Sequence, residues 1–521
     1  MTFTYGSEKE EWLKDVTAVW NREGHKTAAG RTILVNAIPM GSGECIDELI
    51  AGTRRAHLTS PASAAFIQLA NAKWRAKTGR DLVGATENLV LSPVVIAMWK
   101  PMAEAIGWGK KPIGWQEILA LAREPQGWTT RGFPQWGSFK FGHTHPEASN
   151  SGLIALFAEA YAAAGKTRDL TLADLRRPAT AQFVSGIENA VVHYGSSTGF
   201  FGRKMFERGP GFLSAAVLYE SVVIESYSPK YAPPFPVVAI YPKEGTFWSD
   251  HPVGIVEAEW VTPEHREAAK AYIQYLLAPA QQAKAVPYGF RPALPEMTLS
   301  APIDAAHGVD PKEPKTTLQV PSTEVIDAAL DMWRQNKRHA NISLLLDISG
   351  SMNSEGGARI GGAKAGARQL VEALGDADRF SLLAFNQTAR WLHDGVLLKE
   401  ARPTVASTID SLYAEGGTAL YDSIDAAYTR MSARGAKDDR IRAIVVLTDG
   451  EDTNSTLKLP GLLDRIRFDG ERQTIRVFTI AYGSEAKKDV LQQIAEATQA
   501  RSFEGKPENI RAVFRDISAF F

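Results

Sequence analysis

One stretch limits what this chain can fold into more than any other: residues 341–352, with the sequence NISLLLDISGSM. Its apolar part, residues 342–346, is typical of a buried parallel strand, and Asp347 stands where that strand would end. Ser349 and Ser351 follow at alternate positions. Because ligands bind at the carboxyl ends of the strands in open α/β sheets, the stretch predicts a polar site at a sheet edge.

The chemistry of this stretch indicates a hard metal ion. One carboxylate and two hydroxyls within five residues offer oxygen ligands, which suit Mg²⁺, Mn²⁺ or Ca²⁺ better than Zn²⁺. The pattern alone is weak evidence, because Asp and Ser are also common at the starts of loops and helices.

Two later segments strengthen the metal hypothesis. Residues 414–420, AEGGTAL, place Thr418 on a Gly-Gly turn before a helical pattern. Residues 444–450, IVVLTDG, end a second buried strand at Asp449. The three segments would bring oxygen ligands to the same edge of one sheet.

Together these motifs closely resemble the von Willebrand factor A domain and its metal-ion-dependent adhesion site, over residues 342–521. The resemblance implies a Mg²⁺ site, or a Mn²⁺ or Ca²⁺ site, with the hydroxyls as direct ligands and the aspartates acting mostly through water. The implied metal residues are Asp347, Ser349, Ser351, Thr418 and Asp449. Neutral direct ligands leave much of the ion's charge uncompensated, so an Asp or Glu carboxylate of a partner protein is the implied ligand.

Composition limits the remaining possibilities. A chain of 521 residues is expected to hold two to four domains, and 44% hydrophobic and 22% charged residues are ordinary for a globular protein. The net charge of −1 gives no electrostatic case for nucleic acid binding. No run of eighteen apolar residues is present, so we expect no membrane helix. With Cys45 as its one cysteine, the chain cannot form an internal disulfide.

The first half of the chain alternates between strand and helix patterns, which predicts a parallel or mixed α/β sheet in two lobes. We expect a strand at 31–37, a helix that Ser60 and Pro61 open, and a helix over 183–194. Polar turns between a strand and a helix lie at 5–8, 58–63, 141–153 and 216–221. Helix N-termini at such turns can bind an oxyanion.

Several segments of this half resemble type II periplasmic solute-binding proteins of the molybdate- and sulfate-binding group. The segments are FTYGSEKE, LTSPAS, LSPVVIAMW, GHTHPEASNSGL and LYESVVI, within residues 2–295. The resemblance implies that a cleft between two lobes is lined by Ser7, Ser60, Ser149, Asn150, Ser151 and Tyr219. The alternative is that the Ser and Asn residues only cap helices.

The class of solute stays open. Glu8, Glu44 and Glu220 lie close in sequence to the predicted cleft loops. If they face the cleft, they disfavour an oxyanion, and a peptide or a cationic group becomes possible.

We predict three segments: a solute-binding-like domain at 1–295, a Pro-rich connector with a lead-in helix at 296–336, and a von Willebrand factor A domain at 337–521. The connector carries seven prolines between 287 and 321, which favour an extended, semi-rigid backbone. The expected fold class is α/β: a two-lobed periplasmic-binding-protein-like domain, then a doubly wound, mostly parallel sheet.

Two further motifs suggest other functions, hydrolysis and the binding of a transition metal. Residues 195–199, GSSTG, match the nucleophile pattern of hydrolases, but a real nucleophile needs a strand before it and a helix after it. His143, His145 and Glu147 offer metal-ligand chemistry, although such residues more often serve turns and helix caps.

The sequence favours a non-enzymatic, metal-dependent adhesion protein of the bacterial envelope. One alternative is the solute receptor of a transport-type system that docks through its A domain. Another is a cytoplasmic partner of an AAA+ ATPase. No signal peptide is visible at Met1, and a mature form that has lost its leader and a native cytoplasmic start both fit this beginning.

Overall fold

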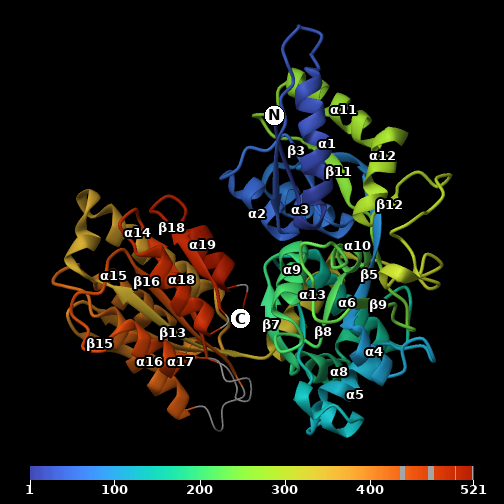
Figure 1. Ribbon diagram of the computed structural model, residues 1–521. Coiled ribbons are helices and arrows are strands. Elements are labelled where there is room, and N and C mark those ends of the chain that lie inside the picture. Colours follow the sequence, from blue (N-terminus) through green and yellow to red (C-terminus); the bar gives the residue numbers. More distant parts are fainter. Residues whose placement is uncertain (435–439, 468–474, 499, 519, 521) are drawn as a thin grey trace. The chain divides into compact units, whose positions relative to one another are not determined.

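The computed structural model describes residues 1–521 except 435–439, 468–474, 499, 519 and 521, and leaves out the side chains of 355, 512 and 515. Its internal contacts divide the chain into two compact units, Met1–Lys337 and Arg338–Phe521. Both units combine helices with strands (Figure 1). Segment 296–336, the expected connector, belongs to the first unit by its contacts.

The first lobe of the first unit is built on a sheet with the strand order β2-β1-β3-β11-β4. β2, β1 and β3 are parallel, and β11 is antiparallel to both of its neighbours. The strands are β1 (Thr2–Gly6), β2 (Asn36–Met40), β3 (Leu58–Ser60), β4 (Val83–Asn88) and β11 (Pro252–Val256). The helices of this lobe are α1 (Glu10–Glu23), α2 (Ser42–Ala51), α3 (Ala64–Thr78), α11 (Pro263–Leu277) and α12 (Pro279–Ala285).

An aromatic core holds this lobe together. Trp12, Val16 and Trp20 recur every four residues along α1 and are buried. This spacing places them on one helix face. The Trp20 ring meets the Tyr272 ring of α11 edge-on, with 5.2 Å between centroids.

Two expected element bounds in this lobe are wrong. The strand expected at 31–37 is β2, which begins only at Asn36. The helix expected to open at Ser60 begins at Ala64, because Ser63 is the cap and its hydroxyl accepts the Ala65 N–H at 3.3 Å. Ser60 instead ends β3, which leaves its side chain at the sheet edge.

The second lobe contains a sheet with the order β10-β5-β8-β6-β7, and β9 and β12 also pair with β5. The strands are β5 (Val90–Trp99), β6 (Phe141–Thr144), β7 (Val191–Gly195), β8 (Ala215–Tyr219), β9 (Val237–Ile240), β10 (Trp248–Ser249) and β12 (Arg291–Pro292). The helices are α4 (Lys100–Ala105), α5 (Trp115–Ala122), α6 (Asn150–Ala164), α7 (Leu172–Leu175), α8 (Pro178–Glu188), α9 (Thr198–Arg208), α10 (Glu220–Glu225) and α13 (Thr323–Asn336).

The chain passes between the lobes beside His251. Leu89 and Val90 belong to the core of the first lobe, whereas β5 pairs with β8 of the second lobe from Val94 onward. The return passage, between β10 and β11, contains His251 at φ 40°. The Leu89 N–H donates to the His251 carbonyl at 3.2 Å, so the two passages are hydrogen-bonded to each other.

The helix expected over 183–194 is wrong at its second half. α8 ends at Glu188, and β7 begins at Val191. Apolar residues at 183, 184, 187 and 191 fit a helical period, but β7 pairs in parallel with β6, so tertiary pairing overrides the local pattern.

The second unit is a sheet in the order β15-β14-β13-β16-β17-β18, parallel except for edge strand β15. The strands are β13 (Ala340–Asp347), β14 (Arg379–Phe385), β15 (Ala389–Leu397), β16 (Ile441–Thr448), β17 (Ile475–Tyr482) and β18 (Ser502–Gly505). The helices are α14 (Ala358–Ala373), α15 (Leu398–Ser411), α16 (Leu420–Arg434), α17 (Leu459–Ile466), α18 (Lys488–Ala497) and α19 (Ile510–Ser518).

Helices cover both faces of this sheet. Apolar side chains of α16, α17 and α18 share one buried cluster with Leu345 and Val446. On the other face, α14 packs against both α15 and α19 (Figure 1). The expected doubly wound, mostly parallel sheet is confirmed.

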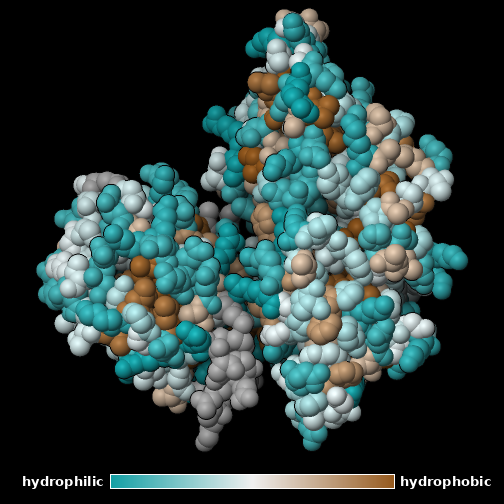
Figure 2. Space-filling view, in the orientation of Figure 1, coloured by the Kyte–Doolittle hydropathy of each residue, from teal (hydrophilic) through white to brown (hydrophobic). Residues whose placement is uncertain are grey.

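Hydrophilic residues dominate the visible surface of each unit, with small brown hydrophobic areas between them (Figure 2). Within the described residues, we find no helix with the length and apolar character needed to cross a bilayer.

Candidate functional site

The end of β13 places a buried carboxylate at the carboxyl edge of the second unit's sheet. Asp347 is fully buried, and its Oδ1 accepts the Ser349 N–H at 2.8 Å. Its Oδ2 accepts the Thr448 hydroxyl at 2.5 Å. Burial raises the pKa of Asp347 to about 6, the Asp449 charge adds to this, and the bonds from Ser349 and Thr448 oppose it. A desolvated carboxylate of this kind favours a nearby cation.

The turn after β13 connects Asp347 to Asp449. The Ser349 and Ser351 hydroxyls lie 3.0 Å apart, and the Ser351 hydroxyl donates to Asp449 Oδ1 at 2.6 Å. Asp449 follows the end of β16, the strand beside β13. Adjacent parallel strands therefore bring the two aspartates to one edge.

Thr418 reaches this edge from the loop between α15 and α16. The Gly350 N–H donates to the Gly416 carbonyl at 2.9 Å, which ties the two loops together. A Cβ added at Gly450 would lie 3.6 Å from the Thr418 hydroxyl and 3.7 Å from the Ser351 hydroxyl. The structure thus gathers all the metal residues named from the sequence: Asp347, Ser349, Ser351, Thr418 and Asp449. We call this set the adhesion edge.

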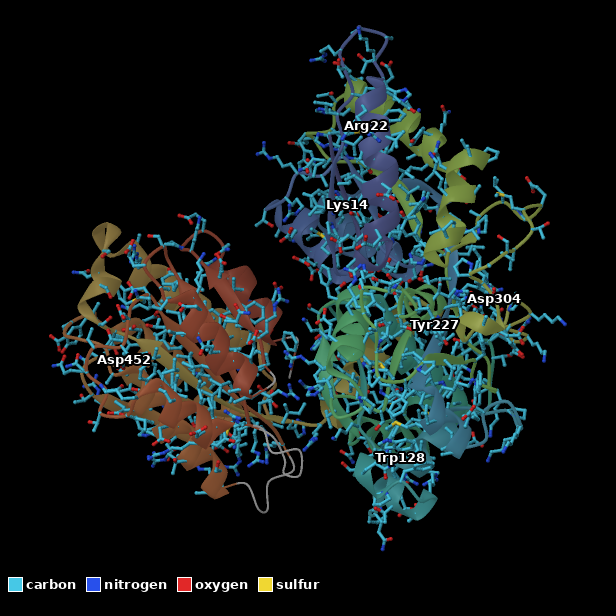
Figure 3. The ribbon with its side chains drawn as sticks, viewed as in Figure 1. Lys14, Arg22, Trp128, Tyr227, Asp304 and Asp452 are labelled. Atoms are coloured by element: carbon cyan, nitrogen blue, oxygen red, sulfur yellow. The ribbon has the colours of Figure 1, made fainter. Side chains whose placement is uncertain are left out.

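Sequence reasoning missed two side chains that act on the adhesion edge. Arg359, in the first turn of α14, donates to Asp449 Oδ2 at 3.1 Å and is nearly buried. Asp452 accepts the Leu420 N–H at 2.8 Å and so holds the first turn of α16 behind Thr418. Figure 3 labels Asp452 in the second unit. A basic residue early in a helix looks like a surface residue in sequence, so no signal distinguished Arg359.

The donor set of the adhesion edge fits a divalent ion with hard oxygen ligands. It offers two carboxylates and three hydroxyls and contains neither a thiol nor an imidazole. Asp347 and Asp449 carry two negative charges, and Arg359 returns one positive charge. The cluster is therefore one charge negative before an ion binds.

In the first unit, the residues predicted to line the cleft stand at strand ends and helix starts. Ser7 follows β1, Ser60 ends β3, and Tyr219 ends β8. Ser149, Asn150 and Ser151 form the N-terminus of α6. All six are buried, and the structure brings them to the junction of the two lobes. We call this set the interlobe cleft.

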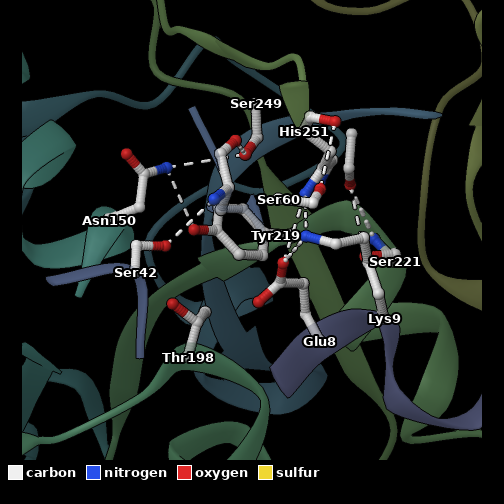
Figure 4. Close-up of polar contacts among 12 residues, drawn as sticks. Glu8, Lys9, Ser42, Ser60, Asn150, Thr198, Tyr219, Ser221, Ser249 and His251 are labelled. Atoms are coloured by element: carbon white, nitrogen blue, oxygen red, sulfur yellow. Dashed lines mark hydrogen bonds and ion pairs between the residues drawn. The ribbon is translucent and has the colours of Figure 1, made fainter. Parts of the chain in front are cut away.

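Asn150 anchors one side of the interlobe cleft (Figure 4). Its Nδ2 donates to the Tyr219 hydroxyl at 3.0 Å and lies 3.5 Å from the Ser249 hydroxyl. Within the described residues, its Oδ1 has no hydrogen-bond partner. The Ser249 hydroxyl in turn donates to the Ala62 carbonyl of the first lobe.

Most hydroxyls of the interlobe cleft bond to one another. Thr198 bonds to Ser149 at 3.2 Å and to Ser151 at 2.9 Å, and Ser151 also lies 2.9 Å from the Thr144 hydroxyl. The Ser7 hydroxyl of the first lobe bonds to Ser197 of the second. Ser197, Thr198 and Ser249 were missed, the first two because residues 183–194 were assigned to a helix.

A buried charge cluster lies beside the interlobe cleft and was also missed. Lys9 Nζ is 2.7 Å from Glu8 Oε1 and 3.0 Å from His251 Nδ1, and all three residues are buried. Burial raises the pKa of Glu8, but Lys9 and His251 lower it more, to about 2. Burial and the charge of Lys9 lower the pKa of His251 to about 4. The cluster is therefore an ion pair beside a neutral imidazole at neutral pH.

The other glutamates named near the cleft, Glu44 and Glu220, also accept hydrogen bonds from neighbouring groups. Glu44 Oε2 lies 3.3 Å from the Gly41 N–H at the start of α2, as a helix-capping residue. Glu220 accepts two hydrogen bonds from Arg291, at 2.7 and 2.8 Å. Each of the three glutamates therefore has a hydrogen-bond partner.

Main-chain atoms of the two lobes touch at glycines. A Cβ at Gly41 would lie 2.7 Å from the Ala148 and Ser196 carbonyl oxygens, and one at Gly199 would lie 2.9 Å from the Glu8 nitrogen. The Gly43 N–H donates to the Ala148 carbonyl at 2.8 Å. The lobes are therefore closed on each other in this structure.

A cavity of about 420 Å³ lies beside Glu8, outside this network. The residues that line it include three aromatic residues, three glutamates and one lysine: Trp12, Tyr227, Tyr288, Glu8, Glu11, Glu225 and Lys230. Lys230 Nζ lies 3.1 Å from Glu11 Oε1 and 3.5 Å from Glu225 Oε1. Figure 3 labels Tyr227. Aromatic faces with carboxylates are the chemistry that binds organic cations.

The hydrolase-like motif at 195–199 has a strand before it and a helix after it, although we expected a helix over 183–194 in the place of the strand. β7 precedes Gly195, and α9 begins at Thr198. The Ser197 hydroxyl nevertheless bonds to Ser7 rather than to an imidazole in the described contacts. Of the other candidate ligands, His143 pairs with Glu188. His145 contacts the Trp333 ring and accepts the Glu147 N–H at 3.3 Å, whereas the Glu147 carboxylate pairs with Arg334.

Comparisons with known proteins match both halves of the chain. Residues 1–291 match the family of bacterial extracellular solute-binding proteins. Residues 341–514 match the von Willebrand factor type A domain. The resemblances to a bacterial solute-binding domain and to a von Willebrand factor A domain are confirmed.

Two curated relatives are uncharacterized proteins. One from Mycobacterium tuberculosis is 23% identical over 447 residues, which cover 80% of this chain and 61% of that protein. One from Synechocystis is 31% identical over 182 residues, covering 34% of this chain and 40% of that protein. The chain thus spans less than two thirds of the length of these relatives.

Solved structures are similar at lower identity. A periplasmic thiamin binding protein is 14% identical, with a TM-score of 0.46, and the match covers 64% of this chain and 95% of that one. A von Willebrand factor type A protein from Catenulispora acidiphila is 21% identical, with a TM-score of 0.30, covering 35% of this chain and 42% of that one.

Proposed function

Because the chain belongs to the family of bacterial extracellular solute-binding proteins and carries a von Willebrand factor type A domain, we propose that it is an extracytoplasmic binding protein that captures a partner's carboxylate through a divalent ion at the adhesion edge. The two domains support a binding or transport-associated role.

The observation that carries this proposal is the charge balance of the adhesion edge. Two aspartates and Arg359 sum to one negative charge, so a divalent ion leaves the site one charge positive. Ser349, Ser351 and Thr418 add oxygen ligands without adding charge. An anionic ligand such as an Asp or Glu side chain completes the neutralisation.

The chain's own residues would do three things. Asp347 and Asp449 would hold the ion at the strand ends, and the Ser349, Ser351 and Thr418 hydroxyls would fill its coordination sphere. Arg359 would restrain Asp449 in place. When bound, the ion supplies a positive centre for a carboxylate. We propose binding without catalysis.

Thermal unfolding of the full chain with increasing MgCl₂ tests the metal site. We expect Mg²⁺ to raise the unfolding temperature of the wild type and to leave Asp347→Ala unchanged. At one hundred times the dissociation constant, the stabilisation amounts to about 2.7 kcal/mol. Asp410→Ala is the matched control, since Asp410 is half exposed on the same unit and pairs with Arg368.

A Mg²⁺ response that Asp347→Ala retains would remove the metal site from the adhesion edge. Capture is tested separately, by pull-down from envelope extract with Mg²⁺ or EDTA and with acidic peptides as competitors. Capture that ignores EDTA, Asp347→Ala and the peptides would contradict carboxylate binding even if Mg²⁺ binds.

The cavity beside Glu8 favours a second candidate, the solute receptor of a transport-type system. Its aromatic and carboxylate lining predicts an organic cation rather than an oxyanion. A quaternary ammonium compound would then stabilise the wild type but not a Glu225→Gln variant. Stabilisation by molybdate or sulfate instead would assign the interlobe cleft to an oxyanion.

A further inference from the structure

Three ligand-type side chains meet inside the second lobe, away from the interlobe cleft. His143 lies on β6, Glu159 on α6, and Glu188 at the end of α8. All three are fully buried, and one ligand atom from each lies within 4.8 Å of the others. Three separate elements thus supply one nitrogen and carboxylate oxygens to a single point.

The imidazole of His143 is oriented as in metal-binding histidines. Its Nδ1 lies 2.7 Å from the Thr144 carbonyl, which can only accept, so Nδ1 carries the hydrogen. Its Nε2 lies 2.9 Å from Glu188 Oε1, so in the absence of an ion a proton lies between these two atoms. A hydrogen bond from one ring nitrogen to a backbone carbonyl is the usual support for a histidine that binds a metal through the other.

Glu188 is supported from its other side. The Tyr194 hydroxyl donates to Glu188 Oε2 at 2.5 Å, which leaves Oε1 directed at the imidazole. A ligating carboxylate held by an outer hydrogen bond is again typical of metal sites.

Glu159 is the residue that the fold leaves unexplained. In the part of the chain that the structure describes, neither of its carboxyl oxygens has a hydrogen-bond partner. Burial, and then the charge of Glu188, raise its pKa well above the ordinary value. A buried carboxyl without partners is costly, and the cost disappears if a cation lies between it and the neighbouring ligands.

From these contacts we propose that His143, Glu159 and Glu188 form a structural site for a divalent transition metal ion of the Zn²⁺ or Mn²⁺ class. Binding would release the proton that lies between His143 and Glu188 and the proton of Glu159. The neutral imidazole and the two carboxylates would then carry two negative charges, which one divalent ion balances. One imidazole nitrogen with carboxylate oxygens suits these metals better than Mg²⁺ or Ca²⁺. This site is independent of the adhesion edge.

The geometry needs only a small adjustment. Ligand atoms of a tetrahedral zinc ion lie about 3.3–3.5 Å apart, given bonds of about 2.0–2.2 Å. Glu159 would have to move inward by about 1 Å, and the 2.9 Å between His143 Nε2 and Glu188 Oε1 would have to widen to about 3.3 Å. Glu159 has no bond that would oppose such a shift.

The ion would fix the layer on which α13 packs. Trp333 of α13 meets the Tyr194 ring edge-on at 5.7 Å and the His145 ring at 4.7 Å. Tyr194 is also the residue that supports Glu188. Metal binding would therefore stabilise the surface against which α13, the last helix of the first unit, packs.

The test compares the full chain with Glu159→Gln, both purified without a histidine tag and with excess Mg²⁺ so that the adhesion edge is occupied. ZnCl₂ or MnCl₂ is added, unbound metal is removed by dialysis, and bound metal is measured by mass spectrometry. We expect about one additional equivalent in the wild type and none in Glu159→Gln. Glu207→Gln, at an exposed pair with Lys204, is the control and should keep the metal.

Two readouts separate the metal from simple folding effects. Gln has nearly the shape of a protonated Glu, so Glu159→Gln should fold as well as the metal-free wild type. Zn²⁺ or Mn²⁺ should raise the unfolding temperature of the wild type by about 5 °C and leave the variant unchanged. Co²⁺ should give visible d–d absorption bands in the wild type alone.

Equal metal content in the wild type and Glu159→Gln would overturn the proposal. So would a wild type that retains neither Zn²⁺ nor Mn²⁺ and shows no thermal response to either. Failure of the Mg²⁺ response at the adhesion edge would not affect it, because that response depends on Asp347.

Discussion

The interlobe cleft and the adhesion edge both gather hydroxyls and carboxylates at strand ends, but they balance charge in different ways. In the first unit, Lys9 lies against Glu8, and the cleft hydroxyls bond to one another, both within the second lobe and, from Ser7 to Ser197, across the lobes. At the adhesion edge, Arg359 compensates only one of two aspartates. The buried charge beside the cleft is therefore compensated by a residue of the same cluster, although Asn150 Oδ1 has no hydrogen-bond partner among the described residues. The aspartates of the adhesion edge keep one negative charge that Arg359 does not compensate.

This difference shows how sites of similar composition come to need different ligands. A polar cluster that contains its own cation needs no bound ion, and a ligand must replace the hydrogen bonds that its residues already make. A cluster with a net negative charge favours a cation and, once a divalent ion is bound, a further anion. Three variants test whether the contrast is real.

The largest expected effect comes from removing the internal cation of the first unit. Lys9→Met leaves Glu8 buried beside a neutral imidazole, and breaking such a pair costs about 3–5 kcal/mol. Urea unfolding followed by tryptophan fluorescence measures it, because Trp391 is the single tryptophan of residues 338–521 and the first unit dominates the signal. Lys14→Met, at an exposed lysine of α1, the helix that begins directly after Lys9, is the control (Figure 3). If the two variants lose equal stability, the cleft does not depend on its own cation.

A smaller effect is expected from pH. His251 faces Lys9 and Glu8, and its pKa of about 4 lies below the unfolded value of about 6.5. The neutral ring is favoured in the folded state, so its contribution is complete above pH 6.5 and is lost as the pH falls toward 4. The loss reaches about 3 kcal/mol at pH 4.

Urea unfolding between pH 7.5 and 4 would measure this loss, and His251→Asn should show a shallower decline than the wild type. Asn is suitable because it tolerates the positive φ of this position. Identical slopes for the two proteins would place the pH dependence elsewhere.

The smallest effect is expected at the adhesion edge. Arg359→Gln removes the internal cation of the adhesion edge, so Mg²⁺ should bind more tightly by about 1 kcal/mol, while the partner's carboxylate should bind more weakly. Isothermal titration with MgCl₂, followed by capture at saturating Mg²⁺, separates the two effects. A variant that weakens both equally would show that Arg359 only positions Asp449.

The adhesion edge was predictable from the sequence because its residues stand in short motifs. Asp347, Ser349 and Ser351 lie within five residues, and Asp449 ends an adjacent strand of the same apolar character. Arg359 was not predictable, because its charge looked like that of an exposed helix start. The assignment of a metal to these residues stays a prediction.

The interlobe cleft was only partly predictable because its contacts join distant segments. Ser149 and Tyr219 were found from strand-to-helix turns, but Thr198 was hidden by the continuous helical period before β7. His251 comes 242 residues after Lys9, its hydrogen-bond partner. Contacts of this kind form only in the tertiary structure, so no local sequence pattern indicates them.

The glycine contacts between the lobes have a consequence for mutational tolerance. Main-chain atoms meet at Gly41, Gly43 and Gly199, so most substitutions of nearby side chains leave this contact unaltered. A single added methyl group at any of the three places carbon against a neighbouring backbone that cannot rotate away. A saturation scan of the first unit should therefore find these positions intolerant even of alanine, each acting as a wedge that favours separated lobes.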